Sequence, residues 1–341
     1  MLTAKENMRQ VILGGTPDRL VNQYEAIQLL FHPFMMFSSP LLKKGDPDRV
    51  NAWGVTNSFP ENVPGAFPVH TPDKIVIKDI ENWRDYVKFP SLDFTEEQWA
   101  ICKGMYAAVD GEKAFKACFV APGIFEQCHF LMGFEDTLTN LYEHPEEMHE
   151  LIAYITDYRI RYVKMLIDNL QPEVIFSHDD WGTKESLFMS PEMWREFFKE
   201  PYRRFYGYIR SRGVIAIHHA DSYLVPIVED MAEIGIQAWQ GVLPENDIPA
   251  LQEKLKGRMI LMGGVGAAID RPDSTREEIF DYVTRVCERC CPGGHFIPCI
   301  TYGLSGTVFH HVDPVINEAI EAYNAAIVPP LSALSVVIND L

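Results

Sequence analysis

The chain has 341 residues, with 30 Lys and Arg against 48 Asp and Glu, so its formal net charge is −18 at pH 7. Proteins that bind nucleic acids need clustered Lys and Arg to contact phosphates, and this acidic balance argues against such a partner. Hydrophobic residues make up 47% and charged residues 23% of the chain, which excludes wholesale disorder. Seven cysteines are odd in number and sparse, so no disulfide framework is expected and a reducing, cytoplasmic location is predicted.

The N-terminus reads as structure and not as a targeting segment. Thr3 and Glu6 have the spacing of a capping box that opens an amphipathic helix. No run of about 18 apolar residues occurs, so no membrane span is expected.

Residues 1–95 are irregular in pattern and predict an N-terminal extension with helices and a proline-rich loop. Prolines fall at every fourth position in this loop, at Pro60, Pro64, Pro68 and Pro72. Proline fixes φ and removes a donor, so this stretch cannot be a helix. Two interpretations remain: a loop on the surface, or a lid or wall over a pocket. The domain prediction has this loop covering the mouth of a barrel whose main part is residues 96–341.

After residue 110, short β-type runs alternate with amphipathic helices, as in βα units around a parallel sheet. The runs occupy residues 116–121, 173–178, 214–219, 236–241, 258–264 and 295–300. Two further strands around residues 34–38 and 74–78 would bring the count to eight, which predicts an α/β fold of the (β/α)8 TIM barrel type. The alternative is an open doubly wound sheet, but the Gly-rich phosphate turn expected early in such a chain is missing.

Three helices carry clear local signals. Apolar residues keep a 3.6-residue period from Met148 to Leu166. A second helix is expected to begin at Ser190, with Pro191 in first position, and to kink at Pro201. A third is expected to begin with a capping box formed by Ser274 and Glu277.

Polar residues follow the predicted strands, and active sites of (β/α)8 barrels lie at the carboxyl ends of the strands. The strand ends carry His178 to Trp181, His218 to Asp221, Gln240-Gly241, Gly263 to Gly266, and Cys299 followed by Thr301 to Gly303. These ends therefore predict a rim with His, Asp and Cys side chains.

Some of these residues point to a metal site. His218 and His219 are adjacent on an extended segment, so one is expected to pack while the other enters the site. His219 and Asp221 share a face, and a thiolate from Cys299 together with an imidazole suits Zn²⁺, whose catalytic sites keep three protein ligands and one open position. Asp179 and Asp180 could each bind substrate or cap a turn, and Asp180 is preferred for the site.

These stretches resemble the uroporphyrinogen decarboxylase superfamily over residues 95 to 327. The resemblance is densest in DDWGTKESLFMSPEMWREFFKEPYRRF, GVIAIHHADSYLVPIVEDMAEIGIQAWQG and FIPCITYGLSG. Its members are (β/α)8 barrels. The chain looks more similar to the corrinoid-dependent methyltransferases of the superfamily than to the decarboxylases, because it lacks their arginine-rich R-Q-A-G-R-Y motif, which grips substrate carboxylates.

The resemblance implies a zinc ligand set of His219, Asp221 and Cys299, with Asp221 at a position where thiol-methylating relatives have a cysteine. A harder ligand suits an oxygen-containing substrate, which favours the first methyltransferase of anaerobic O-demethylase systems. Such relatives also use glutamate ligands, and Glu185 and Glu200 have their spacing. Glu185 is the more plausible of the two, and which of them joins or replaces Asp221 stays open.

The predicted function is methyl transfer from an O-methyl donor, an aromatic methyl ether, to the cob(I)alamin of a separate corrinoid protein, with zinc as Lewis acid. Asp180, Tyr302 and Glu185 are the predicted catalytic residues. The predicted substrate-binding residues are Trp53, Phe59, Phe67, His178, Trp181 and Gln240. Three alternatives stay open: a methylcobalamin:thiol methyltransferase, a uroporphyrinogen-type decarboxylase, and a corrinoid-binding protein without catalytic activity.

Overall fold

The computed structural model describes residues 1–39, 41–63, 65–302 and 308–327. Pro64 of the proline-rich loop, and Gly303 to Gly306 of the FIPCITYGLSG stretch, lie outside these residues. Two compact units are distinguished, and each is treated by itself. The central unit comprises Gln28–Gly111 and Phe115–Gln237, and the terminal unit comprises Met1–Ile27, Glu112–Ala114 and Ala238–Leu341.

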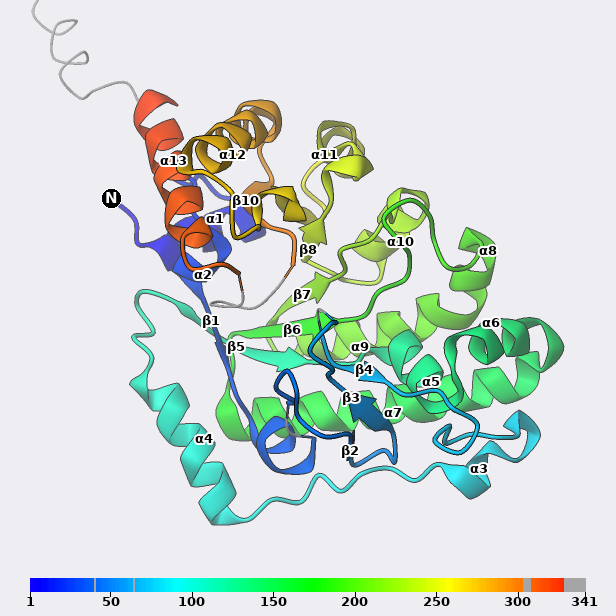
Figure 1. Ribbon diagram of the computed structural model, residues 1–341. Helices are drawn as coiled ribbons and strands as arrows, with labels where there is room; N and C mark the ends of the chain where they lie inside the picture. The colour runs from blue at the N-terminus through cyan, green and yellow to red at the C-terminus, as the bar shows by residue number, and fades with distance from the viewer. Residues whose placement is uncertain (40, 64, 303–307, 328–341) are drawn as a thin grey trace, which may run out of the picture. The chain divides into compact units, whose positions relative to one another are not determined.

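The central unit is built on three neighbouring parallel strands, β5 (Phe115–Val120), β6 (Val174–His178) and β7 (Ile215–His219), which follow each other in chain order (Figure 1). Their residues are mostly buried, as expected for parallel strands covered by helices. All three were predicted from the sequence to within two residues. The register pairs His178 with His219, and Ser177 with His218, so each pair shares one face of the sheet.

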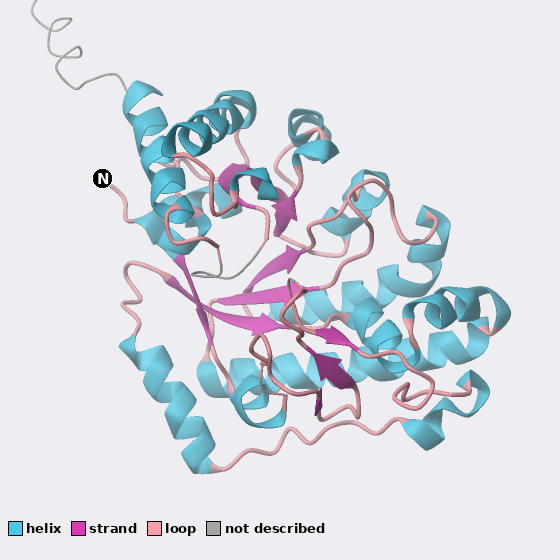
Figure 2. Cartoon of the chain, viewed as in Figure 1, coloured by secondary structure: helices cyan, strands magenta, loops and turns pink. Residues whose placement is uncertain are grey.

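Helices connect these strands and pack beside them, as Figure 2 shows. They are α4 (Glu96–Ala108), α5 (Ile124–Met132), α6 (Phe134–Glu143), α7 (Pro145–Leu170), α8 (Pro191–Trp194), α9 (Glu200–Ser211) and α10 (Val228–Glu233). The apolar stripe predicted on α7 is confirmed, since Leu151, Ile155 and Leu166 are fully buried. Helix α7 packs against both α5 and α9.

The predicted helix start at Ser190 is confirmed, because the Ser190 hydroxyl accepts a hydrogen bond from the Met193 N–H. A π-helical turn, Arg195–Lys199, separates α8 from α9 and immediately precedes the segment that contains Pro201. Proline has no N–H to complete the regular ladder, and a wider turn is one way in which a helix accommodates this loss. The kink predicted at Pro201 stays a prediction, and the irregularity that the structure shows is the π-turn just before it.

The N-terminal part of the central unit is less regular. It carries a small antiparallel sheet of β2 (Arg49–Val50), β3 (Thr56–Ser58) and β4 (Phe67–Pro68). Its other elements are β1 (Ile27–Leu30), whose first residue belongs to the terminal unit, a π-helix over Phe34–Ser38, a 3-10 turn over Ile80–Asn82 and α3 (Trp83–Tyr86). The strands predicted at 34–38 and 74–78 are wrong: the first is the π-helix, and the second has no regular structure. Short apolar runs do not distinguish strand from helix, which explains the first error.

The terminal unit has its own parallel strands, β8 (Ala238–Val242), β9 (Ile260–Val265) and β10 (Phe296–Ile300), again in chain order and again as predicted. Its helices are α1 (Ala4–Leu13), α2 (Gln23–Ala26), α11 (Ile248–Leu255), α12 (Arg276–Cys290) and α13 (Val312–Ile327). Helices α12 and α13 pack together around a buried core that includes Ile279, Val283, Ile316 and Ile320.

Two capping boxes were predicted in this unit. The Thr3 side chain accepts from the Glu6 N–H, which confirms the start of α1. At α12 the box is formed by Thr275 and Glu278, one residue later than predicted. Both pairs have the same spacing, and sequence alone could not separate them; only the contact of the Thr275 hydroxyl with the Glu278 N–H decides the start.

Both units therefore show parallel strands alternating with helices, a mixed α/β fold. Closure into a complete eight-stranded barrel stays a prediction. Within the described part of the chain, no helix combines the length and the apolar character needed to cross a membrane.

The close approach of β8 and β9 predicts a strong glycine requirement. Gly263 has φ +151°, and a Cβ there would lie 2.5 Å from the Val242 carbonyl oxygen. We expect Gly263→Ala to lower the free energy of unfolding by about 2 kcal/mol or more, because both backbone strain and the clash oppose it. The measurement is chemical denaturation followed by circular dichroism.

Gly207→Ala is the matched control. Gly207 lies inside α9, and a Cβ added there would meet nothing within 4 Å, so alanine should be neutral or stabilising by roughly 0.5–1 kcal/mol. Equal effects at the two glycines would contradict the packing described for β8 and β9.

Candidate active site

A cavity of about 700 Å³ lies within the central unit. Most of the residues in its wall are aromatic or aliphatic, and the others are polar or charged. The wall is formed by Phe34, Met35, Ser39, Leu41, Leu42, Arg49, Asn51, Asn57, Gly65, Ala66, Phe67, Pro68, His70, Phe119, Ala121, Pro122, Glu126, His129, Phe130, Phe134, His178, Asp180 and Phe188. A concave, mainly apolar cavity of this size with a few converging polar groups is typical of a small-molecule site. The proline-rich segment contributes part of this wall, through Gly65 to Pro68 and His70.

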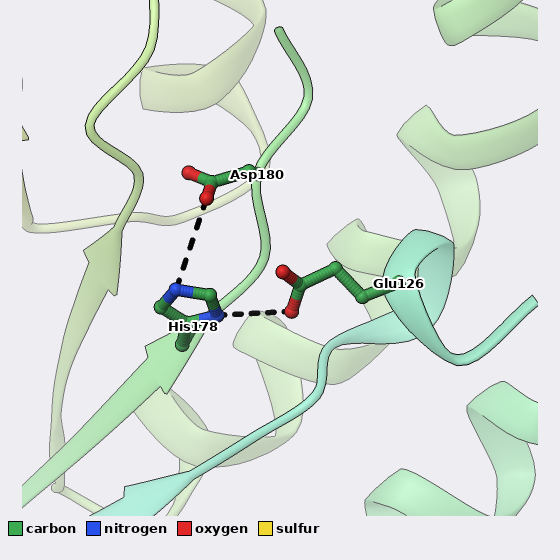
Figure 3. A group of neighbouring side chains, drawn as sticks. All are labelled: Glu126, His178 and Asp180. Atoms are coloured by element: carbon green, nitrogen blue, oxygen red, sulfur yellow. Dashed lines mark hydrogen bonds and ion pairs between the residues drawn. The ribbon is translucent and has the colours of Figure 1, made fainter. Parts of the chain in front are cut away.

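Three ionisable side chains meet at the wall of the cavity: Glu126, His178 and Asp180 (Figure 3). His178 Nδ1 lies 2.9 Å from Glu126 Oε2, and His178 Nε2 lies 3.8 Å from Asp180 Oδ2. The side chains are 26%, 10% and 28% exposed for His178, Glu126 and Asp180, so the cluster is largely shielded from water. Each residue offers a ligand atom within 4.8 Å of the others, which makes the cluster a candidate metal site.

Asp179 positions the helix that carries Glu126. Its carboxylate accepts hydrogen bonds from the N–H groups of Phe125 (3.0 Å) and Glu126 (2.8 Å) in the first turn of α5. A carboxylate at a helix N-terminus satisfies donors that have no partner in the helix and is favoured by the helix dipole. Gly123 makes this approach possible, since a Cβ there would lie 2.2 Å from an Asp179 oxygen.

The register of β6 and β7 places the adjacent residues His218 and His219 on opposite faces of the sheet. His219 stacks on His178 with ring centroids 4.8 Å apart. His218 is fully buried on the other face, where it stacks on Trp181 and its Nδ1 lies 2.7 Å from the Tyr206 hydroxyl. The prediction that the two histidines face opposite sides, with one of them packing in the core, is confirmed. His219 is not among the residues that line the cavity, and its entry into the site stays a prediction.

The electrostatics of the cluster favour a charged His178. Burial disfavours the imidazolium and by itself would lower the pKa of His178. Glu126, together with Asp180 and Asp179, has a larger opposite effect, and the pKa of His178 rises to about 10. Burial, reinforced by the Asp180 carboxylate, raises the pKa of Asp221 to about 6. Burial and the nearby Glu126 charge also raise the pKa of Asp179 well above its usual value, against the effect of its backbone donors. Shifted carboxylates around a histidine are typical of functional sites.

Two further histidines of the cavity wall behave differently. Burial lowers the pKa of His129 to about 4, and it also lowers the pKa of His70. His129 lies among aromatic rings, with its ring centroid 5.3 Å from that of Phe125 and 5.6 Å from that of Phe134. Both imidazoles are therefore neutral near pH 7 and can serve as hydrogen-bonding groups without adding charge to the cavity.

Of the aromatic residues predicted to bind substrate, some line the cavity and others do not. Phe67 lines the cavity. Trp53 and Trp181 do not line the cavity. The ring of Trp53 packs against that of Tyr158, with centroids 4.8 Å apart, and the buried Trp181 donates its indole N–H to the Tyr202 hydroxyl. Phe59 is half-buried and is not part of the cavity wall. Large aromatic side chains have much apolar surface to bury, which favours core packing.

Of the predicted polar residues in the central unit, His178 and Asp180 line the cavity. Asp221 is next to the cluster, because its N–H donates to Asp180 Oδ1 at 3.2 Å. Glu185 is exposed in a turn, and Glu200 is exposed on α9, where it pairs with Arg203. The structure thus brings neither glutamate into the cavity wall.

The remaining predicted residues belong to the terminal unit. Cys299 is fully buried in β10, and burial raises the pKa of its thiol. Gln240 donates from Nε2 to the Ile300 carbonyl at 3.1 Å. The Tyr302 hydroxyl donates to the Asp270 carboxylate. A ligand set of His219, Asp221 and Cys299 stays a prediction.

Glu126 was missed by sequence reasoning. It lies in the first turn of α5, which follows the carboxyl end of β5, whereas only the ends of later strands were considered. Applying the same rule to the first strand of the series would have found it.

A family profile described as uroporphyrinogen decarboxylase (URO-D) matches residues 50–306, which is most of the chain. The chain belongs to the uroporphyrinogen decarboxylase family. Among solved structures, this family member is similar to a methyltransferase from Methanosarcina mazei, with a TM-score of 0.71 and 14% identity, over 95% of this chain and 99% of that one. At that identity the likeness shows the fold. No curated protein matches the chain.

The raised pKa of His178 predicts how stability changes with pH. A histidine has an ordinary pKa of about 6.5 in the unfolded chain, and this one rises to about 10 in the metal-free folded state. Its stabilising effect is therefore complete below pH 6.5 and lost as the pH rises towards 10. We expect the free energy of unfolding of the chelator-treated wild type to fall as the pH rises from about 6.5 to about 10. The fall should be about 2–4 kcal/mol larger than in the His178→Gln variant, which lacks the titrating group.

The measurement is urea denaturation at a series of pH values, with His310→Gln as control, since His310 is exposed and outside the cavity wall. Parallel pH curves for the wild type and His178→Gln would show that Glu126 and Asp180 do not stabilise the imidazolium.

Proposed function

We propose that this protein is a methyltransferase that moves the methyl group of a small O-methyl compound, an aromatic methyl ether, to the reduced corrinoid of a partner protein. The observation that carries the proposal is the Glu126–His178–Asp180 cluster in the wall of a cavity whose other residues are mostly apolar. The shared fold with a methyltransferase supports the same reaction class.

The composition of the cavity wall favours an aromatic substrate. Phe119, Phe130, Phe134 and Phe188 all line it, and Phe134 and Phe188 meet edge to face at 4.8 Å. Aromatic rings bind well between such side chains, because edge-to-face contacts add to the free energy of apolar burial.

Cleavage of a methyl ether requires help at the oxygen, since an unprotonated aryl oxide leaves poorly. The C–O bond breaks, the oxygen takes up a proton, and the methyl group is transferred to the strongly nucleophilic reduced corrinoid. His178 can supply that proton from Nε2, because Glu126 holds the other ring nitrogen and both carboxylates stabilise the imidazolium. The remaining task of the cavity is to orient the ether oxygen towards Nε2.

The same residues fit a divalent metal such as zinc. His178 Nε2 and Asp180 would serve as ligands, with Glu126 either completing the set or orienting the imidazole through Nδ1, an arrangement common in metal sites. A metal bound there supplies Lewis acidity to an ether oxygen. Nitrogen and carboxylate donors suit an oxygen-containing substrate better than a thiol, which disfavours the thiol-methylating alternative.

Decarboxylation of a polycarboxylate is the second candidate within this family. Such a substrate needs several cations, but Arg49 is the only Lys or Arg among the described residues that line the cavity. Two carboxylates in the same wall, Glu126 and Asp180, would repel it further. The composition of this cavity therefore favours methyl transfer.

The activity prediction concerns His178. We expect His178→Gln to lower the rate of methyl transfer at least about 100-fold, the usual contribution of a positioned proton donor or metal ligand. The measurement is the absorbance change of the corrinoid when its reduced carrier protein is mixed with a methoxylated aromatic compound. Glu192→Gln is the control, since Glu192 is exposed on α8 and outside the cavity wall. An unchanged rate for His178→Gln, or no absorbance change for the wild type with any methoxylated donor, would contradict the proposal.

Metal analysis separates the two candidate ligand sets. We expect zinc content to fall at least about tenfold in His178→Gln and Asp180→Asn, because each loses a ligand, and to stay at the wild-type level in Cys299→Ser. Loss of zinc in Cys299→Ser and His219→Gln, with full occupancy in His178→Gln, would instead support the ligand set predicted from the sequence.

A further inference from the structure

Arg49 is a cation in the cavity wall that no carboxylate among the described residues neutralises. It lies on β2 and is exposed, and within the described part of the chain it has no ion pair. The acidic residues nearest in sequence are already engaged. Asp48 pairs with Lys74 at 2.8 Å, and Asp46 accepts a hydrogen bond from the Lys43 N–H.

Two side-chain amides accompany Arg49 in the wall. Asn57 is its partner across the antiparallel β2–β3 pair, so their side chains lie on the same face of this ribbon. Asn51 follows β2, and its Oδ1 accepts from the N–H groups of Trp53 (2.9 Å) and Val55 (3.1 Å). Because this turn occupies the oxygen, the NH₂ group of Asn51 is the end that remains for another partner.

The other polar groups of the cavity cannot take over the role of Arg49. His70 and His129 are neutral, because burial lowers the pKa of each. His178 is already flanked by Glu126 and Asp180. An anionic group entering the cavity therefore has one unneutralised cation available among the described residues. Beside it lie the NH₂ group of Asn51 and that of Asn57, which donates one of its two hydrogens to the Val55 carbonyl at 3.4 Å and keeps the second.

We infer that Arg49, Asn57 and Asn51 form a binding site for one carboxylate of the substrate, so that the methyl donor is a methoxylated aromatic carboxylic acid. A single guanidinium matches a single carboxylate in charge, and its planar fork matches the two oxygens. The assignment of this carboxylate to the methyl donor rests on the proposed function, whereas the anion site does not.

The test compares two probes of nearly the same shape, 4-methoxybenzoate and its neutral amide, 4-methoxybenzamide. Titration calorimetry on the full chain should show at least about tenfold tighter binding of the acid, as expected for charge-assisted hydrogen bonds. In Arg49→Gln the affinity for the acid should fall by a similar factor, while the affinity for the amide stays within about twofold. The affinity of Arg49→Lys for the acid should lie between those of the wild type and Arg49→Gln, because lysine keeps the positive charge but lacks the planar guanidinium that binds both carboxylate oxygens.

Arg84→Gln is the matched control, an exposed arginine that pairs with Glu150 outside the cavity wall and should bind both probes as the wild type does. Asn57→Ala gives a second variant, expected to weaken binding of the acid and not of the amide. Equal binding of acid and amide by the wild type would overturn the inference. An equal loss of affinity for both probes in Arg49→Gln would also overturn the inference, since it would indicate that Arg49 only shapes the cavity wall.

Phenyl phosphate identifies the class of anion. Tighter binding of phenyl phosphate than of 4-methoxybenzoate, lost in Arg49→Gln, would overturn the carboxylate assignment.

Methyl-transfer rates distinguish this inference from the proposed function. Equal kcat/KM for acid and amide would overturn the carboxylate site and leave the methyltransferase standing. Arg49-dependent binding of the acid without any methyl transfer would remove the methyl-donor assignment and leave the carboxylate site standing.

Discussion

The contact between Asp179 and the N-terminus of α5 determines how the rest of the site is arranged. Two backbone N–H groups of this helix donate to the same carboxylate, which ties the carboxyl end of β6 to the first turn of α5. Glu126 belongs to that turn, and His178 immediately precedes Asp179. The 2.9 Å contact between Glu126 and His178 is therefore a consequence of this helix-terminus interaction. Gly123 is part of the same arrangement, because any larger residue would occupy the place of the carboxylate.

The parallel sheet then divides the polar residues between two environments. His178 and His219 share a register position and stack with each other, with His178 in the wall of the cavity. Ser177 and His218 occupy the opposite face, where both contact the Tyr206 hydroxyl at 2.7 Å. Alternation along two strands thus sends one histidine of the adjacent pair to the core and the other towards the site. A shift of one residue in the register would exchange them.

The cavity combines one cluster of mutually dependent charges with a wall that is otherwise nearly uncharged. Glu126 and Asp180 hold a proton on His178, whereas burial keeps His70 and His129 neutral. Such contrasts between neighbouring histidines arise because the low dielectric penalises an unpaired charge and rewards a paired one. The proposed protonation of an ether oxygen by His178 depends on this contrast. Among the described wall residues, a single arginine is left to recognise an anion.

The sequence by itself determined the six parallel strands after residue 110, the long amphipathic helices and the family, because hydrophobic periodicity and short motifs are local properties of the chain. It also identified His178 and Asp180 at a strand end. It could not find the contact of Glu126 with His178, since the two residues are 52 positions apart and meet only when α5 docks on Asp179. Nor could it separate Trp181, buried in the core, from Phe67 in the cavity wall, because aromatic side chains are suited both to cores and to the walls of binding cavities. Hydrophobic periodicity predicts which strands and helices form, whereas only the tertiary structure decides which individual side chains are buried and which polar groups face one another.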